Sequence, residues 1–571
     1  MNPLVQVVLD DIAQQVATRM DLEVAEVRSL LEVPRESGRG DFALPCFPFA
    51  RVMRRAPQQI AEEIATAFEP GPIIQSCQAT GPFVNFTLDP AERARRVLGA
   101  IHSGGDDFGS QDIGSGKTVV LDYSSPNIAK PFHVGHLRST VIGAALIRVY
   151  RSLGYQTIGV NHLGDWGTQF GHMMAAYSRE DWKDPEREAS DPIPFYRELY
   201  ARFNLEIERD AGLAEEGRNW FRRLEEGDQE ARELWKKFHD VSMIEFDRIY
   251  RKLGVTFDHF TGESFYNDKM DRVVEEARSR EVAVESEGAL VISVGDHVPP
   301  VMLLKSNGTT TYHTRDLAAA MYRQETFDFE MLLYVVGEEQ RLHFQQLFHA
   351  LERMGFEWAA RCRHVGFGRY PNISSRGQGG KRFVGLDEIL DEAIRRAKEK
   401  ASENSDIEDA SGVAEVVGIG AVIFNDLKNN RKKDVDFDPE DWNTILEFRG
   451  DTGPYVQYSH ARTASIIRKH GAPVSTRIDY QLLTTPEDRT LVSLLESYPG
   501  RLAMAGQEVE PSLVTRYLLD LTKALSHYYH KHKVLVEDPP LRAARILLID
   551  CARQVIANGL KILGVAAPER M

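Results

Sequence analysis

The sequence predicts a multidomain α/β protein: a parallel-sheet domain interrupted by a helical insertion, with an α+β domain before it and an all-α bundle after it. Two apolar runs, 118–121 and 157–160, are each followed by glycine and small polar residues, as expected where strands of an open parallel sheet end. Residues 179–296 lack this pattern and are heavily charged. Residues 441–571 repeat apolar positions every three or four residues, which is typical of packed helices.

Length and composition indicate a folded chain of several domains. Its 571 residues correspond to three or four domains at about 150 residues each. With 42% hydrophobic and 27% charged residues, and no run near the roughly 20 apolar residues that a membrane span needs, we expect no membrane partner. The net charge of −16 argues mildly against a nucleic-acid partner, although a local basic face binds phosphates whatever the total charge is.

The cysteines and the N-terminus suggest a compartment. Cys46, Cys77, Cys362 and Cys551 are scattered without a C-x-x-C pair, which favours reduced thiols and argues against a zinc knuckle. The N-terminal segment carries two adjacent acidic residues and amphipathic spacing, so it does not have the pattern of a signal peptide. We therefore expect a cytoplasmic protein.

Residues 1–112 are predicted to form the α+β domain. Leu4–Met20 and Ala56–Phe68 have the apolar spacing of amphipathic helices, and Pro82–Leu88 alternates as a half-buried strand does. Residues His102–Lys117 are rich in Gly, Ser and Asp, which is typical of a linker.

Residues 113–178 are predicted to form the first half of the parallel-sheet domain, and they contain the most informative stretch, Leu121–Gly143. Here a strand ends in the loop Ser124–Asn127, and helical spacing begins after Pro131. A helix N-terminus at such a place offers N–H groups and a partial positive charge to a phosphate.

Two histidines occupy the first turn of that helix. His133 and His136 are three residues apart and can point at the same anion, while Gly135 keeps the backbone bare for a nucleotide and Lys130 adds a charge. A metal pair is the alternative, but zinc-binding helices space their histidines by four with a glutamate between them. We therefore predict no zinc site.

The second strand, Thr157–Val160, is followed by the polar block Asn161–Gln169. On its own this block is more simply interpreted as a tight turn held by an aspartate. Residues 179–296 then read as a solvated helical insertion, in which we find no catalytic motif and expect no editing site.

Residues 297–383 are predicted to be the second half of the sheet domain, resuming at Val301–Leu304. Tyr312 and Asp316 are four apart and share a face if their segment is helical. A carboxylate is the natural bidentate partner of a guanidinium, and an aromatic beside it can stack on that plane. The alternative is an ordinary aspartate at a helix start. A further strand, Met331–Val336, leads into a loop containing Gln340.

Residues 384–440 form a connecting helical region with a basic run, Lys428–Lys433, which is either a solvated face or a phosphate contact. Residues 441–571 form the helical bundle. Within it, His527–Lys533 interleaves aromatic and basic residues, which suits base stacking combined with phosphate contact; the alternative is that the tyrosines belong to the core.

Several blocks, in this order, resemble arginyl-tRNA synthetases of the class I family. They are SSPNIAKPFHVGHLRST at Ser124–Thr140, which carries the HIGH signature, HLGDWGTQ at His162–Gln169, YHTRDLA at Tyr312–Ala318, TGPYVQYSHAR at Thr452–Arg462 and APERM at Ala567–Met571. The resemblance implies a Rossmann-like catalytic domain with a connective-peptide insertion, an N-terminal domain that contacts the corner of tRNA, and an anticodon-binding bundle. The implied activity is arginine–tRNA ligase, acting on L-arginine, ATP with Mg²⁺ and tRNA(Arg), as a monomer.

The resemblance also implies roles for individual residues. Catalytic roles are expected for His133, His136, Lys130, Ser374, Ser375 and Arg376. ATP is expected to bind at His133, Gly135, His136, Gly366 and Phe367, the last two in the segment HVGFG. Arginine is expected to bind at Asp122, Ser124, Ser125, Asn127, His133, Tyr312, Asp316 and Gln340. The N-terminal basic cluster Arg39, Arg51, Arg54 and Arg55 is expected to contact tRNA; otherwise it is a solvated face.

The chain differs from the class I pattern at one motif, and two other classes of protein are alternatives to this assignment. Where class I enzymes carry the lysines of KMSKS, this chain has Asn372 and Ser375, and Lys130 is expected to supply the missing charge, with Arg376 and Lys381 as further candidates. A cysteinyl-type ligase would need zinc-binding cysteines. A non-enzymatic RNA-binding paralogue would be expected to lose the signature histidines, and both are present.

Overall fold

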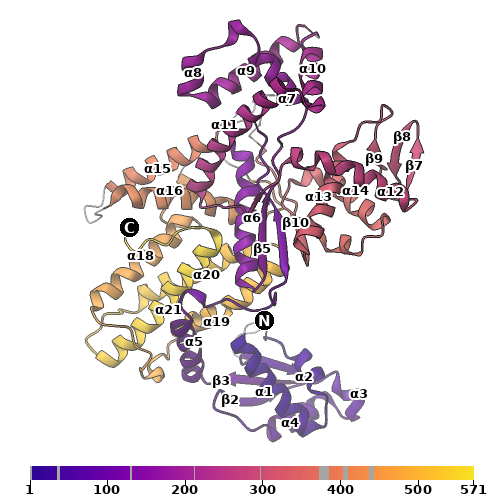
Figure 1. Ribbon diagram of the computed structural model, residues 1–571. Helices are drawn as coiled ribbons and strands as arrows, with labels where there is room; N and C mark the ends of the chain where they lie inside the picture. Colours follow the sequence, from indigo (N-terminus) through magenta and orange to yellow (C-terminus); the bar gives the residue numbers. More distant parts are fainter. Residues whose placement is uncertain are drawn as a thin grey trace.

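The computed structural model describes residues 3–34, 39–128, 132–210, 212–295, 297–371, 385–402, 409–435 and 443–571. A parallel sheet lies at the centre, with helices α8–α10 projecting above it and the N-terminal domain below it (Figure 1). Helices α18–α21 form a bundle on one side, and α12–α14 with a small second sheet lie on the other. The multidomain α/β architecture predicted from the sequence is therefore confirmed.

The central sheet has five parallel strands in the order β11-β10-β4-β5-β6. The strands are β4 Thr118–Asp122, β5 Gln156–Asn161, β6 His259–Phe260, β10 Met331–Tyr334 and β11 Cys362–His364. Helix α6 (Val134–Ser152) leads from β4 to β5 on one side, whereas β10 pairs with the other side of β4. The strand order thus reverses next to β4, where open α/β sheets bind their ligands.

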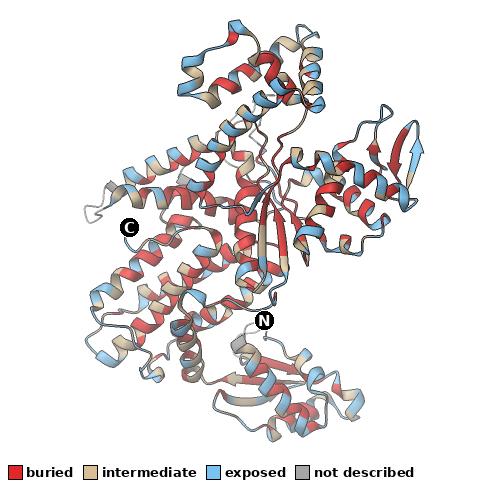
Figure 2. Ribbon diagram, viewed as in Figure 1, coloured by how far each residue is buried: buried red, intermediate tan, exposed pale blue. Residues whose placement is uncertain are grey.

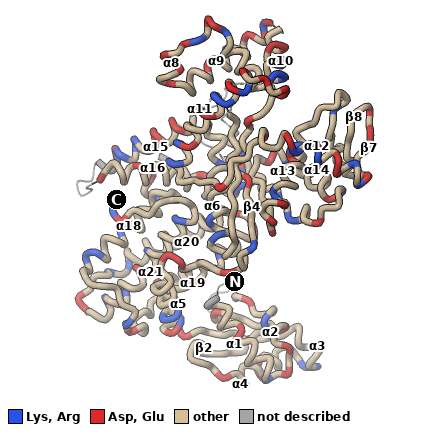
Figure 3. The backbone as a smooth tube through the Cα atoms, viewed as in Figure 1, with Lys and Arg blue, Asp and Glu red and all other residues tan. Residues whose placement is uncertain are grey.

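Residues 179–296 are mostly helical, as predicted, but they also contain strands. After α7 Thr168–Tyr177, which precedes this segment, its helices are α8 Pro185–Ser190, α9 Pro192–Ile207, α10 Gly212–Glu226, α11 Gln229–Leu253 and α12 Met270–Ser279. Figure 3 shows Lys and Arg interspersed with Asp and Glu along α10, and Arg223, for example, pairs with Asp228 at 2.8 Å.

The expectation that Val301–Leu304 resumes the parallel sheet is wrong. This segment is β9, and it pairs antiparallel with β8 (Ala289–Ile292), which pairs antiparallel with β7 (Ala283–Ser286). Residues along β9 alternate between buried and more exposed positions, as in a sheet with one solvated face. A four-residue apolar run does not reveal which sheet it will join.

The N-terminal domain is α+β, as predicted. Its antiparallel sheet has the order β1-β3-β2, and its elements are α1 Pro3–Met20, α2 Val24–Leu30, β1 Phe42–Pro45, α3 Phe49–Met53, α4 Pro57–Ala67, β2 Ile74–Thr80 and β3 Phe83–Leu88. Helix α5 (Pro90–Gly104) runs into the predicted linker and connects this domain to the bundle, because Arg93 bonds Asp41 at 2.9 Å and also pairs with Glu496 of α19.

The C-terminal half is helical. After α13 Tyr312–Phe327 and α14 Arg341–Arg353, the helices are α15 Leu386–Ser402, α16 Ala410–Leu427, α17 Asn443–Leu446, α18 Gly453–His470, α19 Pro486–Gln507, α20 Ser512–Lys531 and α21 Pro539–Leu563. Buried residues follow the central sheet and the inward faces of these helices, whereas the outer faces of α9–α11 are more exposed (Figure 2).

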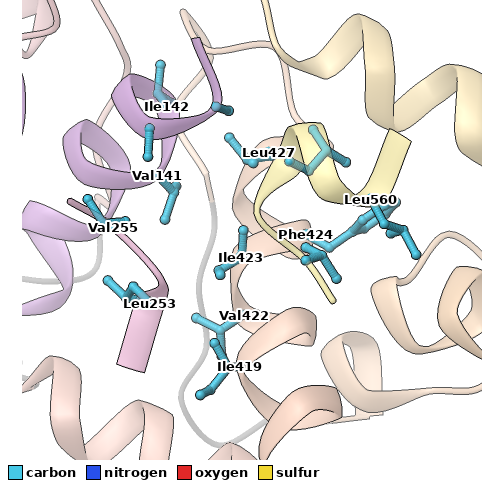
Figure 4. Close-up of a cluster of buried hydrophobic side chains, with 14 of the residues drawn as sticks. Val141, Ile142, Leu253, Val255, Ile419, Val422, Ile423, Phe424, Leu427 and Leu560 are labelled. Atoms are coloured by element: carbon cyan, nitrogen blue, oxygen red, sulfur yellow. The ribbon is translucent and has the colours of Figure 1, made fainter. Parts of the chain in front are cut away.

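One apolar core joins the central sheet to the bundle. Figure 4 shows part of this core: Val141 and Ile142 of α6 lie on one side with Leu253 and Val255, Ile423 and its neighbours on α16 lie in the middle, and Leu560 of α21 lies on the other side. Within the described residues, α16 is long and apolar enough to cross a membrane by composition alone, but 56% of it is buried, and core helices meet the same test.

The aromatic and basic run His527–Lys533 lies at the end of α20, and much of it is engaged within the protein. Tyr528 is fully buried, and the Tyr529 hydroxyl lies 2.8 Å from that of Thr463. Lys531 and His532 both contact the Glu487 carboxylate. The core reading of the tyrosines is therefore the correct one, and Tyr528 is not available for base stacking.

Candidate active site

The signature histidines cap helix α6 reciprocally. The Nδ1 atom of His133 accepts from the backbone N–H of Gly135 at 3.0 Å, and Nδ1 of His136 accepts from the N–H of His133 at 3.2 Å. The two rings lie 3.9 Å apart between centroids. Because each Nδ1 accepts, each neutral ring carries its proton on Nε2, which makes Nε2 the donor toward an anion.

Gly135 is needed for a reason that the sequence did not reveal. A Cβ atom at this position would lie 2.6 Å from Cε1 of His133. The glycine therefore makes room for the imidazole that caps the helix, in addition to leaving the backbone open. Gly135 thus holds the ring of His133, the first histidine of the motif, in place with its backbone N–H.

The loop after β4 is held in an unusual backbone conformation. Ser124 and Ser125 have φ angles of 73° and 49°, in the left-handed region that non-glycine residues rarely adopt. The Ser124 hydroxyl is buried and lies 2.8 Å from the hydroxyls of both Thr140 and Tyr250. The Ser124 hydroxyl is therefore engaged in the core, which favours a supporting role over the expected contact of this side chain with arginine.

Neighbouring polar residues brace the same loop. Ser125 Oγ donates to Asp122 Oδ1 at 3.0 Å, and Asn127 forms a backbone bridge with Gly164 of the block that follows β5. A Cβ at Gly164 would lie 2.3 Å from Asn127 Oδ1, so the two segments approach closely. The predicted blocks at the ends of β4 and β5 are thus brought together.

Asp122 is paired with a buried arginine. Arg323 Nη2 of α13 lies 2.8 Å from Asp122 Oδ2, and Arg323 is only 1% exposed. Burial works against the charge of Arg323, but Asp122 outweighs it and raises the pKa of the guanidinium. The Asp122 carboxylate is therefore engaged by Arg323 within the protein, which favours a supporting role over the expected contact with arginine.

Asp316 lies near the start of α13, next to two imidazoles. His343 Nε2 of α14 lies 2.7 Å from Asp316 Oδ2, and His162 Nε2 lies 4.0 Å from Oδ1. Burial raises the pKa of Asp316, but the hydrogen bond from His343, together with the charges of His343, His162 and Arg323, outweighs burial and holds this pKa below its usual value. The carboxylate is therefore kept ionised.

Tyr312 stands beside this carboxylate on α13, which is helical as predicted. Its ring lies 4.1 Å from that of His313 and 5.4 Å from that of His343, and the side chain is 61% exposed. Gln340 is exposed at the end of the 3₁₀ turn Glu338–Gln340, three residues before His343. The predicted guanidinium readers thus gather at the adjoining starts of α13 and α14.

The HVGFG segment runs beside the loop after β10. The carbonyl of Phe367 accepts from the N–H of Glu338 at 3.0 Å, and a Cβ at Gly366 would collide with the Glu338 carboxylate. The positions expected at the phosphate end, Lys130, Ser374, Ser375 and Arg376, and the candidate Lys381, lie outside the described residues.

Sequence reasoning missed four residues of this region: His162, Arg323, His343 and Arg138. His162 belongs to the HLGDWGTQ block, and Arg323 follows Asp316 by seven residues, the spacing of one helix face. The block and the seven-residue spacing could therefore have indicated His162 and Arg323. The partners of His343 and Arg138 lie in distant segments, and no local pattern indicates them.

The comparisons with known proteins agree with this multidomain architecture. Three family models match the chain: "Arginyl tRNA synthetase N terminal domain" over residues 6–88, "tRNA synthetases class I (R), catalytic domain" over 102–439 and "DALR anticodon binding domain" over 456–571. The chain belongs to the arginyl-tRNA synthetase family. The order of these models places the HIGH signature and the YHTRDLA block within the family's catalytic domain.

Relatives match over nearly the whole chain. The arginine–tRNA ligase of Clostridium botulinum is 44% identical over 98% of this chain and 99% of its own length. That of Alkaliphilus metalliredigens is 42% identical over 99% and 100%. The structure of Thermus thermophilus arginyl-tRNA synthetase aligns over 99% of this chain and all of that one, with a TM-score of 0.81 and 25% identity.

Proposed function

We propose that this chain ligates L-arginine to tRNA(Arg) in two steps. The arginine carboxylate attacks the α-phosphate of ATP, which forms arginyl-adenylate and releases pyrophosphate. The ribose 2′-hydroxyl of the terminal adenosine of the tRNA then takes the arginyl group and releases AMP. The observation that carries this proposal is the full-length match to arginine–tRNA ligases, together with the ionised carboxylate of Asp316 beside Tyr312.

The phosphate chemistry is assigned to the start of α6. The Nε2–H groups of His133 and His136, together with the helix N-terminus, would donate to the α-phosphate as negative charge develops there. Lys130 and the segment Ser374–Arg376 would neutralise the departing pyrophosphate, and Mg²⁺ enters with the phosphates of ATP. No covalent nucleophile is required, because positioning and charge stabilisation suffice.

Arginine is assigned to the region between the end of β4 and the starts of α13 and α14. Asn127 and Ser125 would hold its α-amino and carboxylate groups, with His133 beside them, whereas Asp122 and Ser124 support the loop from behind. Asp316 would accept two parallel bonds from the guanidinium, and Tyr312 and Gln340 would fix its plane. Gly366 and Phe367 are assigned to adenine through their backbone.

The remaining domains are assigned to tRNA. The N-terminal domain would contact the corner of the tRNA through exposed arginines such as Arg51 and Arg54, and the C-terminal bundle would hold the anticodon arm. We propose a cytoplasmic monomer without a membrane partner and without zinc.

The test is ATP–pyrophosphate exchange with each of the twenty amino acids, with and without tRNA. We expect exchange with arginine alone. Lysine and citrulline should be rejected by a factor of about 10⁴ or more, since each leaves hydrogen-bonding groups of the pocket unsatisfied. Canavanine keeps the guanidinium-like fork and should be accepted. Exchange that is driven by another amino acid would refute the proposal. The absence of exchange with every amino acid, with and without tRNA, would refute it as well.

A further inference from the structure

Arg431 connects two distant parts of the molecule through one guanidinium. It belongs to the basic run Lys428–Lys433 that follows α16, and its side chain is half-buried. Its Nη1 atom donates to the carbonyl oxygen of Gly366 at 2.6 Å, and its Nε atom donates to the carbonyl oxygen of Val509 at 2.8 Å. The segment after β11 and the turn between α19 and α20 are therefore bound to the same side chain.

The same turn is also clamped from its next residue. Glu510 is only 7% exposed, and its carboxylate accepts from Asn430 Nδ2 at 2.9 Å and from the backbone N–H groups of Arg431 and Ser512 at 3.3 Å. Through Glu510, the bundle therefore contacts both the backbone of the basic run, at Arg431, and one of its side chains, that of Asn430.

Val509 follows the end of helix α19 in a left-handed conformation. Its φ angle is 52°, which a β-branched residue rarely adopts. The conformation is that of a helix C-terminus: the N–H of Val509 donates to the carbonyl of Gly506 at 3.3 Å, and the N–H of Glu510 donates to that of Ala505 at 2.9 Å. The bond from Arg431 to the Val509 carbonyl adds to these contacts.

On the catalytic side, the HVGFG segment is held by two arginines. Besides the bond to Gly366, the backbone of Arg431 accepts from the N–H of Gly368 at 2.8 Å. Arg138, two residues after His136 on α6, donates from Nη1 to the carbonyl of Gly368 at 2.8 Å and pairs with Asp426 at 3.0 Å. The peptide groups from Gly366 to Gly368 are therefore fixed between α6 and the bundle.

We infer that Arg431 is a positioning residue for ATP, which transmits the seating of the C-terminal bundle to the backbone of Gly366 and Phe367. This inference rests on the proposed assignment of these two residues to adenine. The competing reading, in which the basic run contacts RNA phosphates, accounts less well for Arg431, because its N, Nε and Nη1 donors are all engaged within the protein.

The decisive variant is Arg431→Met, which keeps the length of the side chain and removes its donors. We expect the Kd of ATP, measured by equilibrium dialysis without tRNA, to rise about 10-fold or more, the effect of losing a charged hydrogen bond. In pyrophosphate exchange the KM for ATP should rise similarly, while the KM for arginine stays within about 2-fold. Arg431→Lys should restore part of the ATP affinity, because it keeps a charged donor without the fork.

Matched controls separate the alternatives. Lys432→Met removes the same charge from the neighbouring exposed position and should leave ATP binding unchanged. If Arg431→Met instead leaves ATP binding intact but weakens tRNA binding with a shallower salt dependence, it is a phosphate contact and the inference is overturned. If Arg431→Met does not fold, ATP binding and tRNA binding are measured on Arg431→Lys instead. Weaker ATP binding in this variant supports the inference, and normal ATP binding with weaker tRNA binding overturns it.

Gly366→Ala distinguishes failure of this inference from failure of the adenine assignment. Weaker ATP binding in Gly366→Ala with normal binding in Arg431→Met would leave the adenine site in place and refute the role of Arg431. Normal ATP binding in both variants would refute the assignment itself, and the inference with it.

Discussion

His343 Nε2 lies 2.7 Å from Asp316 Oδ2, so that a histidine of α14 holds the carboxylate assigned to the substrate guanidinium. Because this bond leaves Oδ1 turned toward the more distant His162, at 4.0 Å, the carboxylate has a defined orientation before arginine arrives. Preorganisation of this kind reduces the reorganisation that accompanies binding.

His343→Ala should therefore raise the KM for arginine by about 10-fold, because a charge-assisted hydrogen bond that orients Asp316 is lost. Steady-state exchange kinetics measure this change. His349→Ala, on the exposed side of the same helix, is the matched control and should behave as the wild type. A lower KM in His343→Ala would instead mean that the imidazole competes with the guanidinium for the carboxylate.

Asp316→Asn should lower kcat/KM for arginine by a factor of about 10² to 10⁴, because the bidentate charged pair is lost at a desolvated site. ATP and tRNA affinity should change little. Asp328→Asn provides the control, since it makes the same chemical change at the exposed end of α13, where φ is 43° and asparagine is tolerated. Normal charging by Asp316→Asn would place the guanidinium elsewhere.

Asp122→Asn should act on stability rather than on arginine recognition. The substitution leaves the guanidinium of Arg323 buried without its carboxylate, which costs about 3–5 kcal/mol in comparable pairs. Thermal unfolding followed by circular dichroism should show a lower Tm than that of the wild type. A raised KM for arginine with unchanged unfolding would revive the original expectation that Asp122 contacts the substrate.

His136→Asn and His136→Ala should separate capping from catalysis. The amide oxygen of asparagine can replace Nδ1 as the acceptor for the N–H of His133, whereas alanine cannot, so only His136→Ala should lose the roughly 1 kcal/mol of a helix cap. Both variants lack the Nε2–H donor, and we expect activation to fall by about 10² to 10³ in each. Near-normal pyrophosphate exchange in either variant would exclude His136 from the chemistry.

Glu263 should make stability depend on pH near neutrality. Its pKa is raised to about 7, chiefly by burial; Arg315 opposes the rise, whereas Asp316 and Asp165 contribute to it. Because the folded-state pKa lies above the ordinary value of 4.5, the stability it contributes is complete below about pH 4.5 and is lost as the pH rises through about 7.

Glu263→Gln should remove this dependence, so that the variant is more stable than the wild type at pH 8 by about 1–2 kcal/mol, less than the whole shift because the side chain is partly exposed. The comparison requires unfolding curves at pH 5 and pH 8. Parallel behaviour of the two proteins across this range would show that Glu263 does not titrate there.

The sequence by itself determined the order of the domains, several of the helices and the strand ends that carry the site. These follow from local patterns: apolar spacing over a few turns, glycine and small polar residues at strand ends, and the histidines of the first turn of α6. Tyr312 and Asp316 could be placed on one face because four residues are about one helical turn.

Only the tertiary structure decided which groups meet. Arg323, which pairs with Asp122, lies on a helix 201 residues further along the chain. His343 orients Asp316 from another helix. Arg431 lies between Gly366 and Val509 in the sequence and bonds the carbonyl oxygens of both. The sheet that β9 joins was decided in the same way. A charged residue or an apolar run looks the same in the sequence whatever partner it finds, because that partner is selected by the packing of segments that are distant in the chain.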